Sequence, residues 1–154
     1  MIKMDIQRLL TKVSEFMNDQ VPFQRMLGFE ITEFTPERGE VRFRWRDELM
    51  GNVPQRILHG GVTSTALDTA GGLVAIAGML ARLDNPTEEY LMERLSRCGT
   101  IDLRVDYLRP GRGEEFIASA TIIRSGNKVA VARMELHNQD GTHIAFGTGT
   151  YLVG

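Results

Sequence analysis

The spacing of apolar residues predicts an amphipathic helix near the beginning of the chain. Over residues 4–18, apolar side chains recur at intervals of three and four, with Lys, Arg, Gln and Glu between them. One face of such a helix is apolar and the other is charged, so we expect it to lie on the surface of the domain. Pro22 then marks a break in the chain.

The rest of the pattern predicts two groups of strands separated by one long helix. Alternation of apolar and polar residues predicts a hairpin of strands at 29–34 and 40–46, with a turn at Pro36 and Gly39. A further helical turn is expected around residues 88–95. Four more strands follow it, at 101–107, 116–124, 128–137 and 143–153, with hairpin turns at 125–127 and 140–141. This order is typical of an α+β fold with one antiparallel sheet.

The long helix, from His59 to about residue 82, is rich in small residues. Glycine and alanine recur along it, most densely over residues 70–78. Glycine costs about 1 kcal/mol in a helix interior relative to alanine, so glycines retained there indicate that another backbone approaches closely. A curved sheet wrapped around the helix would meet that requirement.

Asp68 is the one carboxylate in this helix. Between Gly51 and Leu83 the only other charged residues are Arg56 and Arg82. An ionised carboxylate in apolar surroundings is costly unless it is paired or hydrogen-bonded, which makes Asp68 a candidate catalytic group. The alternative is that Asp68 points out of a half-exposed helix or bonds to a neighbouring backbone group. The residue alone leaves both interpretations open.

The composition indicates one soluble globular domain. The chain has 154 residues, of which 42% are hydrophobic and 25% charged. We expect a single domain over 1–154, with the N-terminal helix within 1–20 and the core within 28–154. The formal net charge of −2 argues against a nucleic-acid partner. Charged residues interrupt any signal peptide, and the longest apolar run, 71–81, is too short to span a bilayer, so we expect a cytoplasmic protein without a membrane span.

Several other chemistries are disfavoured by the spacing of their residues. The three histidines, His59, His137 and His143, show no ligand spacing, so we expect no metal. Ser64 lies outside any nucleophile-elbow motif and too close to His59 and Asp68 along one helix to form a triad. Cys98 is the only cysteine, has no evident base and is best interpreted as a small apolar residue.

Three long stretches carry a resemblance to a known family. The motif His-Gly-Gly followed by Leu-Asp-Thr-Ala, at the start of a helix that precedes antiparallel strands, resembles the hotdog-fold acyl-CoA thioesterases of the PaaI type. The stretches most similar to the bacterial YigI branch, whose members act on medium and long acyl chains, read GNVPQRILHGG, RLSRCGTIDLRVDYLRPGRGE and GNKVAVARMELHN. The resemblance implies a hotdog fold, in which a curved antiparallel sheet of about six strands wraps a long central helix.

The resemblance also implies a catalytic role for particular residues. Asp68 matches the family's catalytic carboxylate, which acts as general base or as nucleophile. Gly60 would supply the N–H that polarises the thioester carbonyl, at a helix N-terminus whose dipole aids it. Thr100 would help to place the attacking water, and Asn52 would orient the water or the carboxylate, with Gln55 as its rival. His59 would tie the loop to the start of the helix.

The resemblance implies an acyl-CoA substrate and no separate cofactor, because CoA is part of the substrate. CoA phosphates favour cations, and we select Arg109, Arg112 and Lys128, in or beside strand-end turns, as the residues that reach the nucleotide. Hotdog proteins share their sites between subunits, so we expect a homodimer, within a dimer of dimers. The acyl chain is expected to lie between helix and sheet, beside small or medium residues: Val62, Thr65, Ala66, Thr69 and Leu73.

Three other functions remain open from the sequence. A non-catalytic acyl-CoA-binding module of the same fold would keep the pocket but release no CoA. A thioesterase for aryl groups such as phenylacetyl-CoA would be expected to have a pocket rich in aromatic residues. A hydratase would need a catalytic His–acid pair around the substrate, and His59 instead precedes the helix within the His-Gly-Gly turn.

Overall fold

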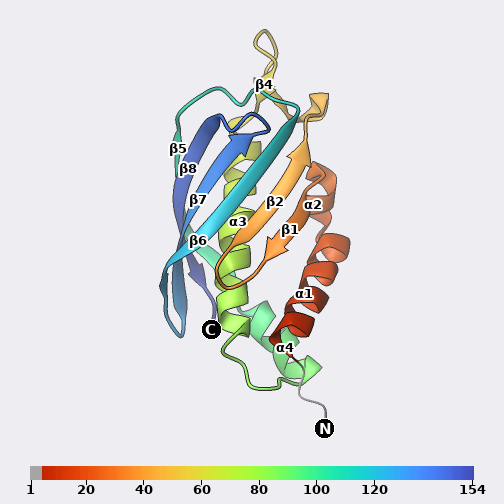
Figure 1. The fold of residues 1–154 in the computed structure, drawn as a ribbon, viewed down its shortest axis with the longest axis vertical. Helices are drawn as coiled ribbons and strands as arrows, with labels where there is room; N and C mark the ends of the chain where they lie inside the picture. Colours follow the sequence, from red (N-terminus) through yellow and green to blue (C-terminus); the bar gives the residue numbers. More distant parts are fainter. Residues whose placement is uncertain (1–4) are drawn as a thin grey trace.

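A six-stranded antiparallel sheet wraps around one long helix, α3 (Gly60–Leu80), in a computed structural model that describes residues 5–154 (Figure 1). This arrangement confirms the predicted α+β fold with a central helix. The strands, in their order across the sheet, are β1 (Glu30–Phe34), β2 (Gly39–Arg44), β6 (Glu115–Ser125), β7 (Val129–Asn138), β8 (His143–Leu152) and β5 (Gly99–Tyr107).

The predicted strand pairings are confirmed where a short turn joins the strands. The β1–β2 hairpin forms, and β6, β7 and β8 follow one another as an antiparallel meander. The sequence pattern left open which strand joins β2 to the meander, and the structure pairs it with β6. β5 pairs only with β8 in this sheet, so it forms one edge, on the left in Figure 1.

The N-terminal segment contains two helices where the sequence predicted one and a break. The first, α1 (Ile6–Gln20), matches the predicted helix and buries Leu9, Leu10 and Val13; the Met4 of that prediction lies outside the described residues. The second, α2 (Pro22–Leu27), begins at Pro22, which suits a first helical position because its missing N–H would have no intrahelical partner there. Gly28 ends this helix with φ 72°, a conformation that favours glycine.

Two further elements frame the N-terminal end of α3 and the edge strand. A two-stranded ribbon of β3 (Met50–Asn52) and β4 (Ile57–Leu58), preceded by the 3-10 turn η1 (Asp47–Leu49), replaces the predicted loop before the helix. The predicted helical turn before β5 is α4 (Glu88–Ser96), which Thr87 caps by accepting a hydrogen bond from the Tyr90 N–H. α1 and α4 lie near the C-terminal end of α3 in Figure 1.

The sheet approaches α3 closely, but the glycine that allows contact with the helix backbone lies in a strand, whereas Gly71 and Gly72 of α3 meet the side chain of Tyr151 where the sequence predicted a backbone. A Cβ added to Gly39 of β2 would lie only 2.6 Å from the carbonyl oxygen of Ala70, so a side chain there would push the strand off the helix. Large side chains of the strands fill the remaining space around α3, with Phe116, Met134 and Leu136 fully buried. One hydrophobic cluster extends in this way from Leu9 to Val153.

α3 is long and apolar enough to cross a membrane by length and composition alone. Most of the apolar stretch of this helix, 61% of it, is buried inside the protein. Its apolar character is therefore explained by its place at the centre of the core. No other helix of the described residues 5–154 meets the same criterion.

Candidate active site

Asp68 and Thr100, which the sequence assigned to one site, are in direct contact. The Thr100 Oγ1 donates a hydrogen bond to the Asp68 Oδ1 over 2.9 Å. Thr100 is the second residue of the edge strand β5, and Asp68 lies on the half-exposed side of α3. The hydroxyl orients the carboxylate through Oδ1, and Oδ2 is the candidate oxygen to accept a proton or to attack an electrophile.

Tyr151 supports Asp68 from behind, and sequence reasoning missed it. Its phenol Oη donates to the backbone carbonyl of Asp68 over 3.2 Å, and the ring is buried with 3% of its surface exposed. Burial raises the pKa of Tyr151, and the negative charge of Asp68 acts in the same direction, so the phenol remains a proton donor. The sequence contains only a tyrosine in β8 as a signal for this contact. That its ring packs over Gly71 of α3 can be seen only in the folded chain.

His59 has the structural role that the sequence predicted. Its Nδ1 accepts a hydrogen bond from the Gly61 N–H over 2.8 Å, which makes it the N-cap of α3. The backbone N–H of His59 donates a hydrogen bond to the Leu49 carbonyl over 2.8 Å and so ties the helix start to η1. Because Nδ1 accepts, the proton of the neutral imidazole is assigned to Nε2.

Gly60 presents the N–H expected of an oxyanion-binding residue. It is the first residue of α3, and within residues 5–154 no hydrogen-bond acceptor contacts its N–H. The peptide that carries this N–H is held through its own carbonyl, that of His59, which accepts hydrogen bonds from the N–H groups of Val62 and Thr63 over 2.9 and 3.3 Å. The Gly60 carbonyl, in the next peptide, accepts a hydrogen bond from the Tyr107 Oη over 2.7 Å. A free N–H at a helix N-terminus points toward a site where negative charge is stabilised.

Gly60 and Asp68 are too far apart to act on the same carbonyl group within one chain. They are eight residues apart on α3, roughly 12 Å along the helix axis at the usual rise per residue. The edge strand shows the same separation: Thr100, beside Asp68, lies near its beginning, and Tyr107, beside Gly60, is its last residue. One chain therefore carries two half-sites at opposite ends of β5.

Asn52 and Gln55 contact each other and lie away from Asp68. The Asn52 Oδ1 accepts a hydrogen bond from the Gln55 N–H over 3.2 Å within the connection between β3 and β4. Both residues are exposed. The role of either in orienting water stays a prediction, because neither is brought to the carboxylate of its own chain.

The three cations selected for CoA are divided between the two ends of the sheet. Arg109 and Arg112 lie in the connection from β5 to β6, whereas Lys128 lies in the β6–β7 turn at the opposite end (Figure 1). Arg109 donates to the His143 carbonyl over 3.0 Å, and Arg112 donates to the Gln55 carbonyl over 2.6 Å. One chain cannot bring all three to one phosphate group.

An apolar cavity lies beside the Asp68–Thr100 pair, in a different place from the expected acyl space. The expected lining residues Val62, Ala66 and Leu73 are buried in the packed core, and the hydroxyls of Thr65 and Thr69 bond back to helix carbonyls. The cavity has a volume of about 140 Å³. It is lined by Gly72, Ala75, Ile76, Cys98, Gly99, Thr100, Tyr151, Leu152 and Val153.

Two of the disfavoured chemistries find no support in the geometry. The Ser64 Oγ donates to the Gly61 carbonyl over 3.1 Å, and the His59 Nδ1 is already occupied, so no triad forms. Burial raises the pKa of the Cys98 thiol, which disfavours the nucleophilic thiolate. These observations agree with the predictions for Ser64 and Cys98.

The prediction about the histidines is wrong in one respect. The sequence suggested that they offer no cluster of metal ligands, yet His137 and His143 lie side by side on β7 and β8, with Glu135 next to them. Spacing along the chain misses this cluster because it is created by the pairing of two strands.

Comparison with known proteins shows the family to which the chain belongs. The model of the family "Thioesterase superfamily" matches residues 55–145, which include Asp68, Gly60 and Thr100. The chain belongs to the thioesterase superfamily. It is 49% identical to the medium/long-chain acyl-CoA thioesterase YigI of Escherichia coli (strain K12), over 96% of each chain. The YigI protein of Salmonella typhimurium (strain LT2) is similar to the same extent, with 49% identity over 96% of each chain.

A solved structure shows the same fold for this thioesterase-superfamily chain. A crystal structure of a Shewanella oneidensis protein related to the thioesterase superfamily superposes with a TM-score of 0.92 and 53% identity, over 97% of each chain. The hotdog fold and the family implied by the sequence are therefore confirmed.

Proposed function

We propose that this thioesterase hydrolyses acyl-CoA thioesters, with medium and long acyl chains as its preferred substrates, to the free acid and CoA. The observation that carries the proposal is the Asp68 carboxylate, which is oriented by Thr100, a residue that itself lines an apolar cavity. The names of the similar YigI proteins supply the acyl-chain class.

The reaction needs a base or nucleophile on one side of the thioester carbonyl and a hydrogen-bond donor on the other. In one route the Asp68 Oδ2 accepts a proton from water while the water oxygen attacks the carbonyl carbon. The oxyanion that forms is held by the Gly60 N–H, and collapse breaks the C–S bond as the CoA sulfur takes up the proton. In the other route Oδ2 attacks the carbon itself, and the C–S bond breaks to give a mixed anhydride and the CoA thiolate. Water then hydrolyses the anhydride to the free acid and restores the Asp68 carboxylate, while the CoA sulfur takes up the proton that this water releases.

We propose that a complete site forms between two chains. β5 is an exposed nine-residue edge, with 54% of Ile101 and 55% of Tyr107 accessible, and such an edge favours pairing with another strand. Antiparallel pairing of two β5 strands about a twofold axis near Leu103 would set the Thr100 end of one against the Tyr107 end of the other. Asp68 would then face the partner's Gly60, and a homodimer would hold two sites.

The same pairing gives a place to the remaining candidate residues. Because the two β5 strands would run antiparallel, the sheet end of one chain that carries the β6–β7 turn would lie next to the sheet end of the other chain that carries the β5–β6 connection. Lys128 of one chain would then approach Arg109 and Arg112 of the other across the interface. Asn52 would likewise approach the carboxylate of the neighbouring chain, with Gln55 as the alternative. We further propose that two such dimers associate.

We also propose that residues 1–154 form a single domain that acts in the cytoplasm. One continuous hydrophobic cluster and one half-buried cysteine support this. No cofactor is proposed for catalysis, since the carboxylate and the backbone N–H supply the chemistry of hydrolysis.

Release of free CoA from a series of saturated acyl-CoAs tests the function. Each CH₂ placed in an apolar site contributes about 0.8 kcal/mol, so kcat/KM should rise from the shortest chains and level off where the cavity is filled. Phenylacetyl-CoA and benzoyl-CoA serve as controls, and higher kcat/KM for these would replace the fatty-acyl assignment with an aryl one. Binding without release of CoA from any thioester would favour a non-catalytic module.

Reversal of the cationic residues tests the proposed contacts with CoA. Arg109→Glu and Lys128→Glu should each raise KM for acyl-CoA by about tenfold with little change in kcat, because they remove binding that is equal in ground and transition states. The matched control is a short acyl thioester that lacks the nucleotide. An equal rise in KM for that substrate would show that the cations do not contact the nucleotide.

A further inference from the structure

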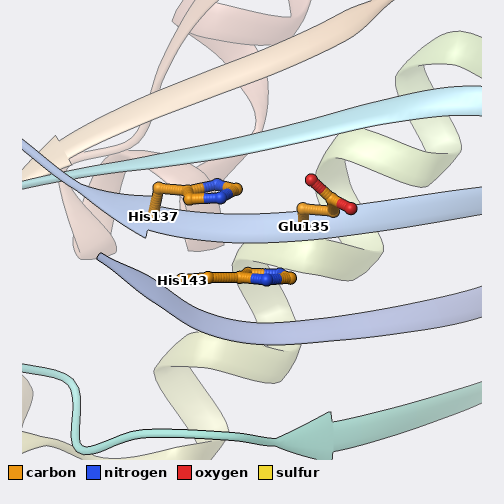
Figure 2. Close-up of side chains that lie close together, drawn as sticks. All are labelled: Glu135, His137 and His143. Carbon is orange, nitrogen blue, oxygen red and sulfur yellow. The ribbon is translucent and has the colours of Figure 1, made fainter. Parts of the chain in front are cut away.

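Glu135, His137 and His143 form a cluster on the face of the sheet that points away from α3. One nitrogen of each histidine and one oxygen of the glutamate lie within 4.8 Å of one another. Figure 2 shows the two imidazole rings nearly parallel, with the carboxylate beside them. The rings stack with centroids 4.5 Å apart and an angle of 11° between their planes.

A β-bulge brings the two histidines to the same face. Leu136 pairs with Ala145, but the next pair is His137 with His143, so Ile144 is an extra residue in β8. In regular pairing the side chain of His143 would point to the opposite face from that of His137, because strand residues alternate. The bulge is held in place, since the Ile144 carbonyl accepts hydrogen bonds from the N–H groups of Leu108 and Arg109.

The cluster contains a polar atom without a partner. The Nε2 of His143 is buried, and no hydrogen-bond partner contacts it within the described chain. Buried polar atoms in native proteins are almost always satisfied, so an atom of this kind indicates a missing ligand such as an ion or water.

The surroundings of Glu135 leave its carboxylate available. Its one ion pair in the described residues is with Arg133, and the nitrogen and oxygen are 3.7 Å apart, longer than a good hydrogen bond. The Arg133 guanidinium lies instead over the Phe146 ring, 5.2 Å from its centroid. Arg133 is therefore a weak competitor for Glu135.

We propose that Glu135, His137 and His143 bind a divalent transition metal ion of the Zn²⁺ class. Two imidazole nitrogens and one carboxylate oxygen form a ligand set typical of zinc, which leaves a fourth position for water. Tetrahedral zinc with ligand distances of about 2.1 Å needs its donor atoms roughly 3.4 Å apart. Small side-chain rotations can bring these atoms from within 4.8 Å to that separation, because the paired strands already fix the backbones.

The bound metal would join the end of β7 to the beginning of β8. It would lie on the opposite side of the sheet from Asp68, since Leu136, which alternates with Glu135 and His137, is buried in the core together with its strand partner Ala145. The metal is therefore a stabilising clamp on the hairpin and takes no part in hydrolysis. Zinc should raise the melting temperature, because it binds the folded chain in preference to the unfolded one.

The test uses the full chain without a histidine tag, stripped of metal with a chelator and titrated with ZnCl₂. We expect one Zn²⁺ per chain by competition with a chromophoric chelator. Because the chain has three histidines, imidazole NMR provides an internal control: the signals of His137 and His143 should shift and that of His59 should not. Absence of stoichiometric binding, or shifts confined to His59, would overturn the proposal.

Variants of the three residues test whether their side chains bind the metal. His137→Ala and His143→Ala should each weaken zinc affinity by more than about tenfold, since even second-shell changes at metal sites cost that much. Glu135→Gln should weaken it as well, whereas the matched control Glu114→Gln, an exposed carboxylate outside the cluster, should not. Arg133→Ala should strengthen binding by removing the competitor. Unchanged affinity in both histidine variants would show that zinc binds elsewhere.

Discussion

Asp68→Asn is expected to lower kcat for acyl-CoA hydrolysis by about two orders of magnitude or more, with the fold intact. The amide keeps the shape of the side chain and can still accept the Thr100 hydrogen bond, but it can neither accept a proton from water nor attack the thioester. KM should change little, because the carboxylate acts on the reacting carbon and does not hold the acyl chain or the nucleotide. Steady-state kinetics of CoA release with a medium-chain substrate provide the measurement.

Thr100→Val provides the graded control for this prediction. It removes the hydroxyl that orients Asp68 but leaves the carboxylate, so we expect a smaller loss of kcat, about tenfold. Sedimentation velocity should show the same oligomer for both variants and the unmodified protein. Near-normal turnover in Asp68→Asn would refute the catalytic assignment, and a stable, active monomer would refute the shared site.

Gly71→Ala is expected to lower the free energy of unfolding by about 1–3 kcal/mol, although alanine favours helices. An added Cβ would lie 2.3 Å from the Tyr151 Oη and 2.8 Å from Cζ, so the buried ring would have to shift. Displacement of Tyr151 would also disturb its hydrogen bond to the Asp68 carbonyl, so kcat should fall too. Denaturant unfolding followed by circular dichroism measures the first effect.

Gly78→Ala on the same helix is the matched control. Its Cβ would meet only the Ser125 Oγ, at an ordinary contact distance of 3.6 Å, so the substitution should stabilise the protein by up to about 1 kcal/mol. Adding Tyr151→Phe to Gly71→Ala removes the closest clashing atom and should restore part of the loss, giving a favourable coupling energy. Equal effects of Gly71→Ala and Gly78→Ala would mean that Tyr151 does not restrict the helix.

Several features of the site were predictable because they depend on nearby residues. The cap of α3 needs only His59 and Gly61, two positions apart, and the exposed N–H of Gly60 follows from its place at the start of that helix. Family resemblance assigned Thr100 to the site as a residue that places water, but its contact with Asp68, 32 residues away, was not predicted, since no local pattern links a helix to an edge strand.

Tertiary structure alone decided the features that depend on packing between distant segments. The position of Tyr151 behind Asp68 depends on the contact of β8 with α3. The α2 helix was also missed, because the sequence pattern showed only a break at Pro22, where the structure begins a helix. An apolar cavity lies beside Thr100, whereas three of the side chains expected to border the acyl chain, those of Val62, Ala66 and Leu73, are buried in the core.

The sequence by itself determined the order of the elements, the central helix with its small residues and the Asp68 carboxylate. These are set by hydrophobic period and turn chemistry, which act over a few residues. The tertiary structure decided the strand order, the placement of Asp68 and Gly60 at opposite ends of β5 and the contact of His137 with His143. A one-residue bulge in β8 sets the contact between the two histidines. The sequence could not determine it, because strand register, and the face of the sheet to which each side chain points, depend on the packing of neighbouring strands.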